Sequence, residues 1–391
     1  IETSPFRGGV LAEGKEIAAF SGSSDAPIEI PLPGFRPWSP EDPFLYQVWV
    51  EMGADRVSGY FAMRKCSVQT GADGLPRLFF NGRPYFQAGV LDQGYWPESL
   101  CTAPSDEAMV ADILRMKELG FNMLRKHAKI EPERFYYHCD RLGMLVWQDM
   151  VNGGAPYRSW FVTYLATFLN WIRLSVGDGK KHYALLSRRE EEGRQEFLRE
   201  AGETISFLYN HPCIVAWVPF NEGWGQFDAA DLAQRIRQMD PSRLVDHASG
   251  WFDQKAGDIL SLHYYFFTLR FRPEAERAAA LTEFGGYACS VPDHRASDKI
   301  YGYRVFKTPE DLTVGYEKLM EKVLLPAVKK GVCASVYTQL SDIEEEVNGI
   351  YTYDRAVCKP DPETVRRWNR TLKETYLRLV GEAPVKDAPV G

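Results

Sequence analysis

An unbroken run of apolar residues at 214–220 stops abruptly at a polar pair, Asn221 and Glu222. A run of this length without alternation is typical of a strand covered on both faces, as strands of parallel sheets are. Two glycines then turn the chain, and apolar residues recur with helical spacing after them. The order of strand, polar loop and helix predicts a parallel α/β fold, in which this loop lies where active sites form.

A second stretch repeats this pattern at residues 278–286, where a short run of small apolar residues ends in Glu283 and two glycines follow. Two carboxylates are therefore expected at equivalent strand ends. Cleavage of a glycosidic bond needs such a pair, one to protonate the leaving oxygen and one to attack or support the anomeric carbon. Repulsion between the two charges is expected to raise one carboxyl pKa, which suits that group as the acid, while the other stays ionised.

The rest of the chain alternates in the same way. Expected strands occupy residues 85–91, 121–125, 144–149, 214–220, 243–249, 258–266, 278–283 and 332–340. Helix starts are marked by Ser105, Thr308 and Asp361, and helix ends by Gly120 and Gly143. The link between the fifth and sixth strands is too short for a full helix. The pattern predicts an α/β fold class, with a (β/α)8 TIM barrel over residues 71–391.

Residues 1–70 differ from the rest, because short alternating segments are separated there by Gly, Pro, Ser and Asp. This pattern is typical of small antiparallel sheets. The strands it predicts are fewer than an immunoglobulin-like sandwich requires. We therefore expect a partial immunoglobulin-like β-sandwich domain ahead of the barrel.

Together these motifs resemble a known family. Asn221-Glu222 after a fourth strand and Glu283 after a seventh resemble the acid/base and the nucleophile of retaining glycoside hydrolases built on (β/α)8 barrels. The strings NMLRKH at 122–127, NHP at 210–212 and YTQLSDIEEEVNGIYTYD at 337–354 narrow the resemblance to family 2. The resemblance implies a jelly-roll sugar-binding domain ahead of the immunoglobulin-like one. We expect that domain to be absent here, although in many members it lends a residue to the sugar site.

The resemblance also assigns roles near the two acids. Asn221 resembles the asparagine that hydrogen-bonds the sugar 2-hydroxyl, with a turn-capping side chain as the alternative. Arg125 resembles the arginine that orients the nucleophile carboxylate, and a structural salt bridge is also open. His127 lies two places after Arg125, whereas the family histidine often lies three places after it. A sugar contact and an ordinary loop histidine are both open for His127.

Further site residues are expected at the same rim. Asp149, His263 and Tyr265 lie at strand ends where sugar hydroxyls would be recognised. Tyr265 also resembles the family tyrosine near the nucleophile, although the adjacent Tyr264 leaves the register of this tyrosine open. Aromatic faces on which a pyranose could stack are offered by Trp224, Trp251 and Tyr337. Core packing is the alternative for each of these three.

Composition limits the partners and cofactors. A net charge of −7 without a basic tract argues against nucleic acid and favours a neutral carbohydrate. The seven histidines form no metal-ligand spacing, so we expect no catalytic metal and no cofactor. The seven cysteines form no C-x-x-C pair, which favours free thiols in a reducing, cytoplasmic compartment. Because the chain opens at Ile1, the loss of a signal peptide stays open. Assembly into a homo-oligomer also stays open.

The longest apolar stretch covers residues 160–176, and polar side chains interrupt it. It is too short and too polar for a bilayer, which needs ~20 apolar residues. We expect an interior or active-site helix here and no membrane partner.

These observations predict a retaining exo-β-glycosidase that removes a terminal sugar from a neutral β-glycoside, with β-galactosidase as the first choice. A β-glucuronidase is expected to carry an Asn-x-Lys reader for the sugar carboxylate near the eighth strand, and none is present there. Acids in that loop would instead repel an anionic sugar, namely Asp342, Glu344, Glu345, Glu346 and Asp354. β-Glucuronidase, β-mannosidase and pentosidase activities stay as alternatives. A truncated enzyme and a non-catalytic carbohydrate-binding barrel stay open as well.

Overall fold

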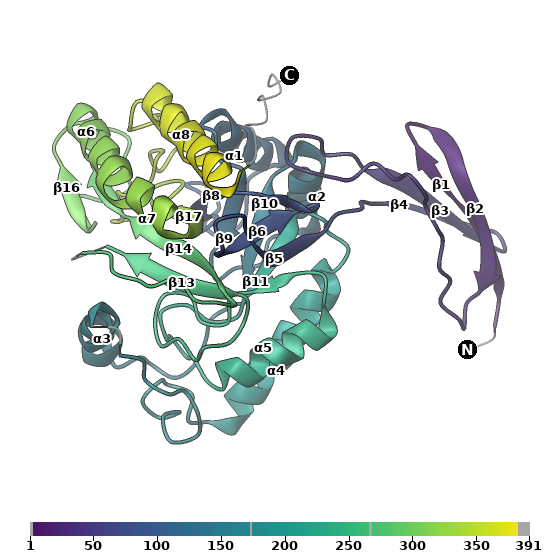
Figure 1. The fold of residues 1–391 in the computed structure, drawn as a ribbon, viewed down its shortest axis with the longest axis horizontal. Helices are drawn as coiled ribbons and strands as arrows, with labels where there is room; N and C mark the ends of the chain where they lie inside the picture. Colours follow the sequence, from purple (N-terminus) through teal and green to yellow (C-terminus); the bar gives the residue numbers. More distant parts are fainter. Residues whose placement is uncertain (1–2, 173, 266–267, 382–391) are drawn as a thin grey trace.

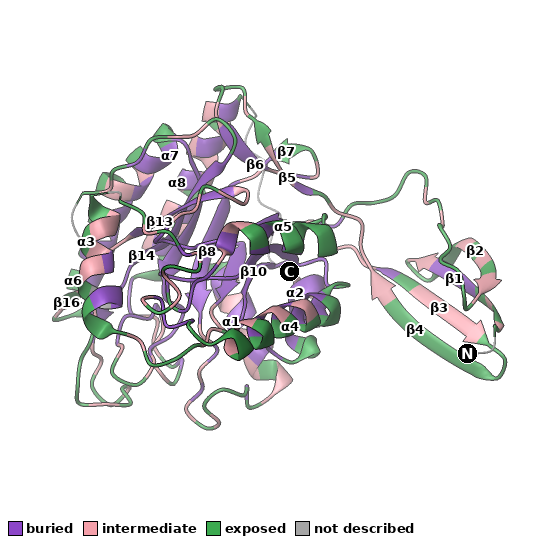
Figure 2. Cartoon of the chain, turned by 90° about the horizontal axis from the view of Figure 1, so that it is seen from below, coloured by how far each residue is buried: buried purple, intermediate pink, exposed green. Residues whose placement is uncertain are grey.

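The computed structural model describes residues 3–172, 174–265 and 268–381. Figure 1 shows two parts, an α/β body and an antiparallel sheet near the N-terminus that extends away from it. In Figure 2 the strands of the body are buried, whereas most of the N-terminal sheet is half-buried or exposed. The hydrophobic core therefore lies in the body.

The body is built on eight parallel strands. They are β8 (Gln87–Asp92), β9 (Met123–Lys126), β10 (Leu145–Asp149), β11 (Ile214–Val218), β12 (Leu244–Val245), β13 (Ile259–Tyr264), β14 (Ala278–Gly285) and β17 (Val332–Thr338). Their order is β12-β11-β10-β9-β8-β17-β14-β13, so the first and the eighth barrel strands pair and the sheet curls round. Among the described residues no strand pairing joins β12 to β13, which leaves one seam open. The predicted TIM barrel is confirmed in this nearly closed form.

Helices cover the outside of the barrel (Figure 1). They are α1 (Asp106–Glu118), α2 (Glu133–Leu142), α4 (Glu191–Leu208), α5 (Ala229–Met239), α6 (Pro309–Leu319), η2 (Met320–Leu324), α7 (Leu325–Lys330) and α8 (Pro362–Val380). The predicted starts of α1, α6 and α8 are confirmed, because Ser105, Thr308 and Asp361 each accept a hydrogen bond from the backbone N–H three residues on. Gly143 ends α2 in the left-handed conformation, with a φ of 71°.

The fifth strand is much shorter than the predicted residues 243–249. The structure describes residues 246–258 and forms no helix there, so the expected loss of the helix is confirmed. Beyond β12 the chain runs beside the end of β11 instead of continuing the ladder. Ser249 N donates to Phe220 O at 2.8 Å, and Glu222 N donates to Ser249 O at 2.9 Å. This path brings the segment after β12 against the loop that carries Glu222.

The long connection between β10 and α4 contains a surface helix. It consists of the π-helical η1 (Trp160–Leu165) and α3 (Ala166–Trp171). The expectation of an interior helix over 160–176 is wrong, because Trp160 is 57% exposed and Tyr164 is 75% exposed. The alternative of an active-site helix stays a prediction. The buried side of the helix includes Phe161, which stacks on Phe252 with ring centroids 5.6 Å apart. Within the described residues, no helix combines the length and the apolar character that crossing a membrane requires.

The N-terminal part forms a single antiparallel sheet in the order β2-β1-β3-β4. Its strands are β1 (Pro5–Ala12), β2 (Lys15–Ser23), β3 (Tyr46–Met52) and β4 (Asp55–Phe61). The described residues contain no second sheet facing it, as a sandwich needs, so the immunoglobulin-like sandwich is not confirmed. A further sheet consists of β5 (Cys66–Thr70), β6 (Pro76–Phe80) and β7 (Arg83–Pro84), with β6 against β14 and β17. This sheet spans residue 70, where the domain boundary is expected. The position of the boundary stays a prediction.

Asp140 at the C-terminal part of α2 joins the N-terminal sheet to the barrel. Its buried carboxylate accepts hydrogen bonds from Tyr60 Oη of β4 and from Cys213 N before β11, both at 2.8 Å. The same carboxylate lies 2.8 Å from His211 Nδ1, and the Asp140 carbonyl accepts from Trp38 Nε1 at 2.7 Å. Because the carboxylate is fully buried, water cannot take its place if it is removed.

We predict that Asp140→Ala lowers the free energy of unfolding by roughly 2–4 kcal/mol, because buried donors lose a charged acceptor. Denaturant unfolding followed by circular dichroism measures the change. The matched control is Asp55→Ala at the exposed start of β4, which should alter stability by less than about 0.5 kcal/mol. Equal stabilities of the two variants would show that Asp140 does not hold the N-terminal sheet against the barrel.

Candidate active site

Two glutamates meet at the carboxyl ends of the barrel strands. Glu222 follows β11 and Glu283 lies in β14, and the two residues are only 8% and 4% exposed. One carboxylate oxygen of each, together with a ring nitrogen of His263, lies within 4.8 Å of the other two atoms. Glu222 has a left-handed φ of 51°, and strained backbone of this kind gathers at functional sites. The turn also requires Gly223, where an added Cβ would lie 2.2 Å from the Phe252 ring.

Arg125 binds three of the predicted site residues at once. Its guanidinium, fully buried on β9, forms a bidentate pair with Asp149 in which both N–O distances are 3.0 Å. Nη1 donates to Glu283 Oε1 at 3.1 Å, and Nη2 donates to Asn221 Oδ1 at 2.9 Å. Burial lowers the pKa of the guanidinium, but the carboxylates of Asp149 and Glu283 raise it by a larger amount, so the pKa is raised overall. Both interpretations of Arg125 are thus present, a structural ion pair and a contact to the predicted nucleophile.

His127 is the outer partner of Asp149. The His127 Nδ1 atom lies 2.8 Å from Asp149 Oδ2. Burial lowers the pKa of His127, but the hydrogen bond to Asp149 and its charge outweigh burial, so the pKa is raised. The pKa of Asp149 is lowered, because Arg125 and His127 outweigh the effect of burial. The His127 side chain is 16% exposed at the rim, which leaves a sugar contact geometrically open.

Glu222 forms its own pair with His263. The His263 Nδ1 atom lies 2.9 Å from Glu222 Oε1 and 3.6 Å from Glu283 Oε2. Burial raises the pKa of Glu222 to about 7, although His127 and Arg125 lower it in part. Burial also lowers the pKa of His263 to about 4, so its ring is neutral near pH 7. The expected rise of one carboxyl pKa is therefore present, but its main cause is burial and not repulsion between the two acids.

The fold decides which of the two adjacent tyrosines, Tyr264 or Tyr265, lies beside Glu283. Tyr265 Oη donates to Glu283 Oε2 at 2.6 Å and lies 2.8 Å from Thr338 Oγ1. Tyr264 instead packs against the hydrophobic core. The Tyr303 ring stacks on Tyr265 with centroids 3.8 Å apart, and it was not anticipated. It lies between β15 (Tyr287–Cys289) and β16 (Arg304–Phe306), in a stretch with neither helical nor strand periodicity, so no local pattern indicated it.

The three aromatic residues expected for stacking lie in different surroundings. Trp224 is 36% exposed, and its ring lies 5.8 Å from that of Tyr157. Trp251 is buried, with its ring 6.5 Å from that of His263. Tyr337 is buried on β17, edge-on to Phe284 at 5.6 Å, which is the placement that core packing predicts. The structure thus leaves sugar stacking open for Trp224 and places Tyr337 in the core.

The acids near the eighth strand do not act together. Asp342 forms a buried ion pair with a lysine at 2.5 Å, and Asp354 pairs with a histidine at 2.7 Å. Glu346 differs from these two acids. Burial raises its pKa, and its carboxyl also interacts with the charges of His127 and Glu283. Glu346 is therefore an acid of this loop whose charge interacts with two residues of the candidate site.

The cluster of Glu222, His263 and Glu283 brings together atoms of the kind that bind metals, which no histidine spacing in the sequence suggested. Each of these side chains already has hydrogen-bond partners. His263 faces Glu222, while Glu283 accepts from Arg125 and Tyr265. We interpret the cluster as a hydrogen-bonded acid–base network, and the absence of a catalytic metal stays a prediction.

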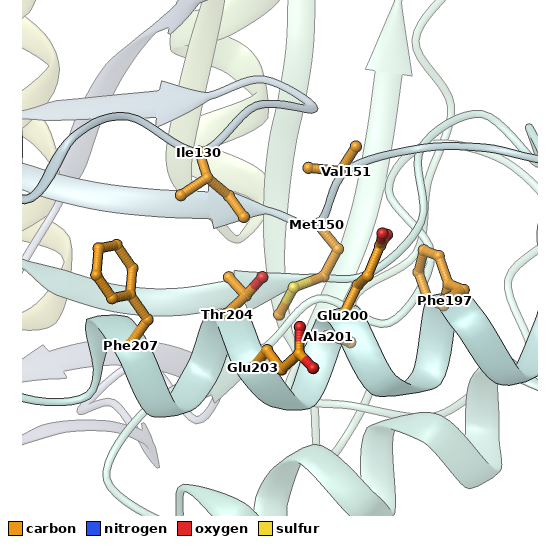
Figure 3. Close-up of a pocket in the computed structure, with 9 residues that line it drawn as sticks. All are labelled: Ile130, Met150, Val151, Phe197, Glu200, Ala201, Glu203, Thr204 and Phe207. Atoms are coloured by element: carbon orange, nitrogen blue, oxygen red, sulfur yellow. The ribbon is translucent and has the colours of Figure 1, made fainter.

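A hollow of about 340 Å³ lies outside this cluster (Figure 3). It is formed by α4 and the segments that follow β9 and β10, and its lining consists of Ile130, Met150, Val151, Phe197, Glu200, Ala201, Glu203, Thr204 and Phe207. None of the predicted site residues lines it. The site of interest is therefore the polar cluster at the strand ends.

Comparison with known proteins gives a family match. The family model described as Glycosyl hydrolases family 2, TIM barrel domain matches residues 77–283, which is more than half of the chain. The matched residues include both Glu222 and Glu283.

Curated relatives and solved structures agree with this match. A Beta-galactosidase of Leuconostoc mesenteroides subsp. mesenteroides is 26% identical over 262 residues, covering 64% of this chain and 22% of the relative. A Beta-galactosidase of Photobacterium profundum is 29% identical over 237 residues, covering 58% of this chain and 20% of the relative. The chain thus spans about a fifth of the length of these relatives.

Among solved structures, the GH2 beta-galacturonidase from Eisenbergiella tayi bound to galacturonate superposes with a TM-score of 0.67 at 18% identity. The superposition covers 94% of this chain and 67% of that one. The FMN-binding beta-glucuronidase from Facaelibacterium prausnitzii L2-6 gives a TM-score of 0.70 at 18% identity, covering 93% and 57%. At this identity the likeness shows the fold. The family match, the nearly closed barrel and the strand-end cluster together lead to one conclusion: this chain belongs to the glycosyl hydrolases of family 2 and contains their TIM barrel domain.

Proposed function

We propose that this protein is a retaining exo-β-glycosidase in which Glu283 is the nucleophile and Glu222 is the general acid and base. The observation that carries the proposal is the unequal surroundings of two adjacent buried carboxyls. Glu283 accepts hydrogen bonds from Arg125 and Tyr265, which hold both of its carboxylate oxygens in place. Glu222 has a pKa raised to about 7 by burial, so it holds a proton near neutral pH. One group is thus prepared to attack and the other to donate.

In the first step, a Glu283 carboxylate oxygen forms a bond to the anomeric carbon while the bond to the leaving oxygen breaks. Glu222 transfers its proton to that oxygen, so the leaving group departs as an alcohol. Arg125 and Tyr265 hold the attacking carboxylate in place, and Asn221, fixed by Arg125, is positioned to contact the 2-hydroxyl of the sugar.

In the second step, Glu222 is ionised and removes a proton from water, whose oxygen then bonds to the anomeric carbon. The ester bond to Glu283 breaks, and the sugar leaves with the configuration it had in the substrate. Two carboxyls about 5–5.5 Å apart are the arrangement of retaining enzymes, since an inverting enzyme needs room for a water between them. The spacing of the two oxygens, within 4.8 Å, supports retention.

A neutral sugar, with galactose first, fits the charges best. Arg125 is already committed to two carboxylates, and the neighbouring Lys126 is buried in ion pairs with Asp92 and Glu131, at 2.9 and 2.6 Å. No described lysine or arginine at the cluster is thus left to bind a sugar carboxylate. The two relatives named Beta-galactosidase point the same way. The uronidases among the solved structures share the fold at low identity, so a uronic acid is the alternative to test.

The first test uses aryl β-glycosides of galactose, glucuronic acid, mannose, xylose and arabinose. We expect turnover of the galactoside, with kcat/KM lowered roughly 10²–10⁴-fold in Glu222→Ala and more than about 10³-fold in Glu283→Ala. Added azide should restore turnover in both variants. The product should be the β-glycosyl azide with Glu222→Ala, because azide attacks the covalent intermediate, and the α-glycosyl azide with Glu283→Ala, because azide attacks the substrate directly.

Glu203→Ala, on the exposed side of α4 next to the hollow of Figure 3, serves as the matched control and should keep kcat/KM within about twofold. Exchange of the two azide products would reverse the assigned roles. A folded protein that turns over none of these glycosides would instead favour a carbohydrate-binding barrel without catalysis.

The second prediction concerns pH. Because Glu222 must donate a proton and its pKa is raised to about 7, kcat/KM should fall as pH rises through about 7. Hydrolysis of the galactoside across pH 5–9 measures this basic limb. In Glu222→Ala, assayed with a dinitrophenyl leaving group that needs no acid, the limb should disappear. A limb that persists unchanged in this variant belongs to another group.

The third prediction concerns the charge of the sugar. Glu346→Gln removes a carboxyl that interacts with Glu283 and His127, so binding of an anionic sugar should improve by roughly 3–10-fold. The inhibition constants of glucuronate and galactose against galactoside hydrolysis measure this, and the constant for galactose should stay unchanged. Equal changes in both constants would mean that Glu346 does not select by charge.

A further inference from the structure

The segment between β14 and α6 lies outside the eight-strand barrel, and the mechanism gives it no role. It forms the two-stranded parallel sheet of β15 and β16, with β16 beside α6 (Figure 1). Tyr303 lies directly before β16 and is half-buried. Its ring nevertheless reaches the hydrogen-bond network of the two glutamates, because it stacks on Tyr265.

Tyr265 lies one residue beyond the end of β13, and among the described residues no strand pairing extends to it. Its hydroxyl lies 2.6 Å from Glu283 Oε2 and 2.8 Å from Thr338 Oγ1. Burial raises the pKa of Tyr265, and the charge of Glu283 raises it further, so the phenol keeps its proton. Tyr265 is therefore the donor to the carboxylate, and the orientation of its ring decides whether this hydrogen bond forms.

Tyr303 covers one face of the Tyr265 ring. The two rings are nearly parallel, with 13° between their planes and centroids 3.8 Å apart. The edges of both rings pack on the backbone of Gly286, where an added Cβ would lie 2.3 Å from Tyr303 Cδ2 and 3.2 Å from Tyr265 Cε1. The ring of His263 lies edge-on to Tyr265, with centroids 6.4 Å apart. Tyr303 thus fills the space into which the Tyr265 ring would tilt on that side.

Backbone hydrogen bonds fix the position of Tyr303 itself. Tyr303 N donates to Gly286 O at 3.1 Å, and Gly286 N donates to Thr338 O at 3.0 Å. Two residues earlier in the chain, Tyr301 N donates to Glu345 O at 2.7 Å. These bonds connect the segment to the end of β17 and to the loop after it. The stacked ring is therefore carried by a backbone that the barrel holds in place.

We infer that Tyr303 is a positioning residue, which acts through Tyr265 to hold the carboxylate of Glu283 in the orientation for attack. Arg125 binds one oxygen of this carboxylate and Tyr265 binds the other, so both donors are needed to fix its plane. Without the stacked ring, water can enter beside Tyr265 and compete for its hydroxyl. The role of Glu283 as the nucleophile rests on the function proposed above, whereas the support of Tyr265 by Tyr303 does not.

Two substitutions separate the ring of Tyr303 from its hydroxyl. Tyr303→Leu removes the stacked ring, and kcat/KM for an aryl galactoside should fall roughly 10–10²-fold, because a small misplacement near the reacting atoms is costly. Tyr303→Phe keeps the ring, so kcat/KM should stay within about threefold of the wild type. Equal kcat/KM values in these two variants would overturn the inference. If Tyr303→Leu does not fold, Tyr303→Gln takes its place, since it also lacks a ring and suits a half-buried position.

A double-mutant cycle tests whether Tyr303 acts through Tyr265. Tyr265→Phe removes the hydroxyl that the stacked ring supports. In this background Tyr303→Leu should lower kcat/KM by less than about threefold more, because the supported contact is already lost. Losses that multiply instead would mean that Tyr303 acts on the site independently of Tyr265, and they would overturn the inference.

Tyr287→Leu is the matched control, because Tyr287 lies on β15 of the same small sheet and its ring packs on Phe306, with centroids 5.3 Å apart. This variant should keep kcat/KM within about threefold of the wild type. A loss as large as that of Tyr303→Leu would reduce the effect to loosening of the small sheet, and the inference would fall.

The second readout needs no activity. ¹³C NMR of full-length protein labelled at tyrosine Cζ, in an equal mixture of light and heavy water, shows two lines for a phenol whose hydroxyl exchanges slowly and one line for a phenol whose hydroxyl exchanges fast. Tyr265→Phe assigns the Tyr265 signal among the 20 tyrosines. We expect two lines in the wild type, Tyr303→Phe and Tyr287→Leu, and one line in Tyr303→Leu, where water reaches the hydroxyl. The same pattern in the wild type and Tyr303→Leu overturns the inference.

The two readouts separate this inference from the proposed function. A Tyr265 hydroxyl that exchanges fast only in Tyr303→Leu, in a protein that hydrolyses no glycoside, supports the stacking role and overturns the proposed function. Activity that depends on both glutamates, with a hydroxyl that Tyr303→Leu leaves unchanged, supports the function and overturns the stacking role.

Discussion

The buried guanidinium of Arg125 is the interaction on which the site depends. A cation taken out of water is tolerated if charged partners with good geometry surround it, and its removal or the loss of one partner leaves an uncompensated charge. Arg125 satisfies this demand with Asp149 from β10, Asn221 from the end of β11 and Glu283 from β14. It therefore ties the carboxyl ends of four barrel strands into one arrangement.

The different surroundings of the two carboxyls follow from this arrangement. Glu283 lies within reach of Arg125 and accepts its hydrogen bond, whereas the nearest partner of Glu222 is the neutral ring of His263. Burial therefore raises the pKa of Glu222, and the charges of His127 and Arg125 lower it only in part. The unequal surroundings of the two acids thus follow from the position of the buried Arg125 guanidinium.

Several elements of this site were predictable from the sequence. The runs that end in Asn221-Glu222 and Glu283 lie at strand ends as expected, because continuous apolar runs bounded by glycines leave few other local structures. Cap residues placed the starts of α1, α6 and α8 for an equally local reason. The short fifth strand was not predictable, since residues 246–249 contain no glycine or proline that would end a strand, and their path beside the loop after β11 depends on hydrogen bonds to residues distant in the chain. The surface position of the helix at 160–171 was missed because its aromatic residues were taken as buried, and aromatic residues have no fixed burial.

Sequence alone determined the parallel α/β order, the family resemblance and the two acids at the ends of equivalent strands. These features depend on periodicity, turn residues and short strings, all of which are local. The tertiary structure decided which tyrosine meets Glu283, that Tyr303 stacks on it, and that Tyr337 lies in the core. It also decided that His263 lies beside Glu222. These properties depend on distances and burial between residues far apart in the chain, such as Arg125 and Glu283, 158 positions apart, and no local pattern encodes them.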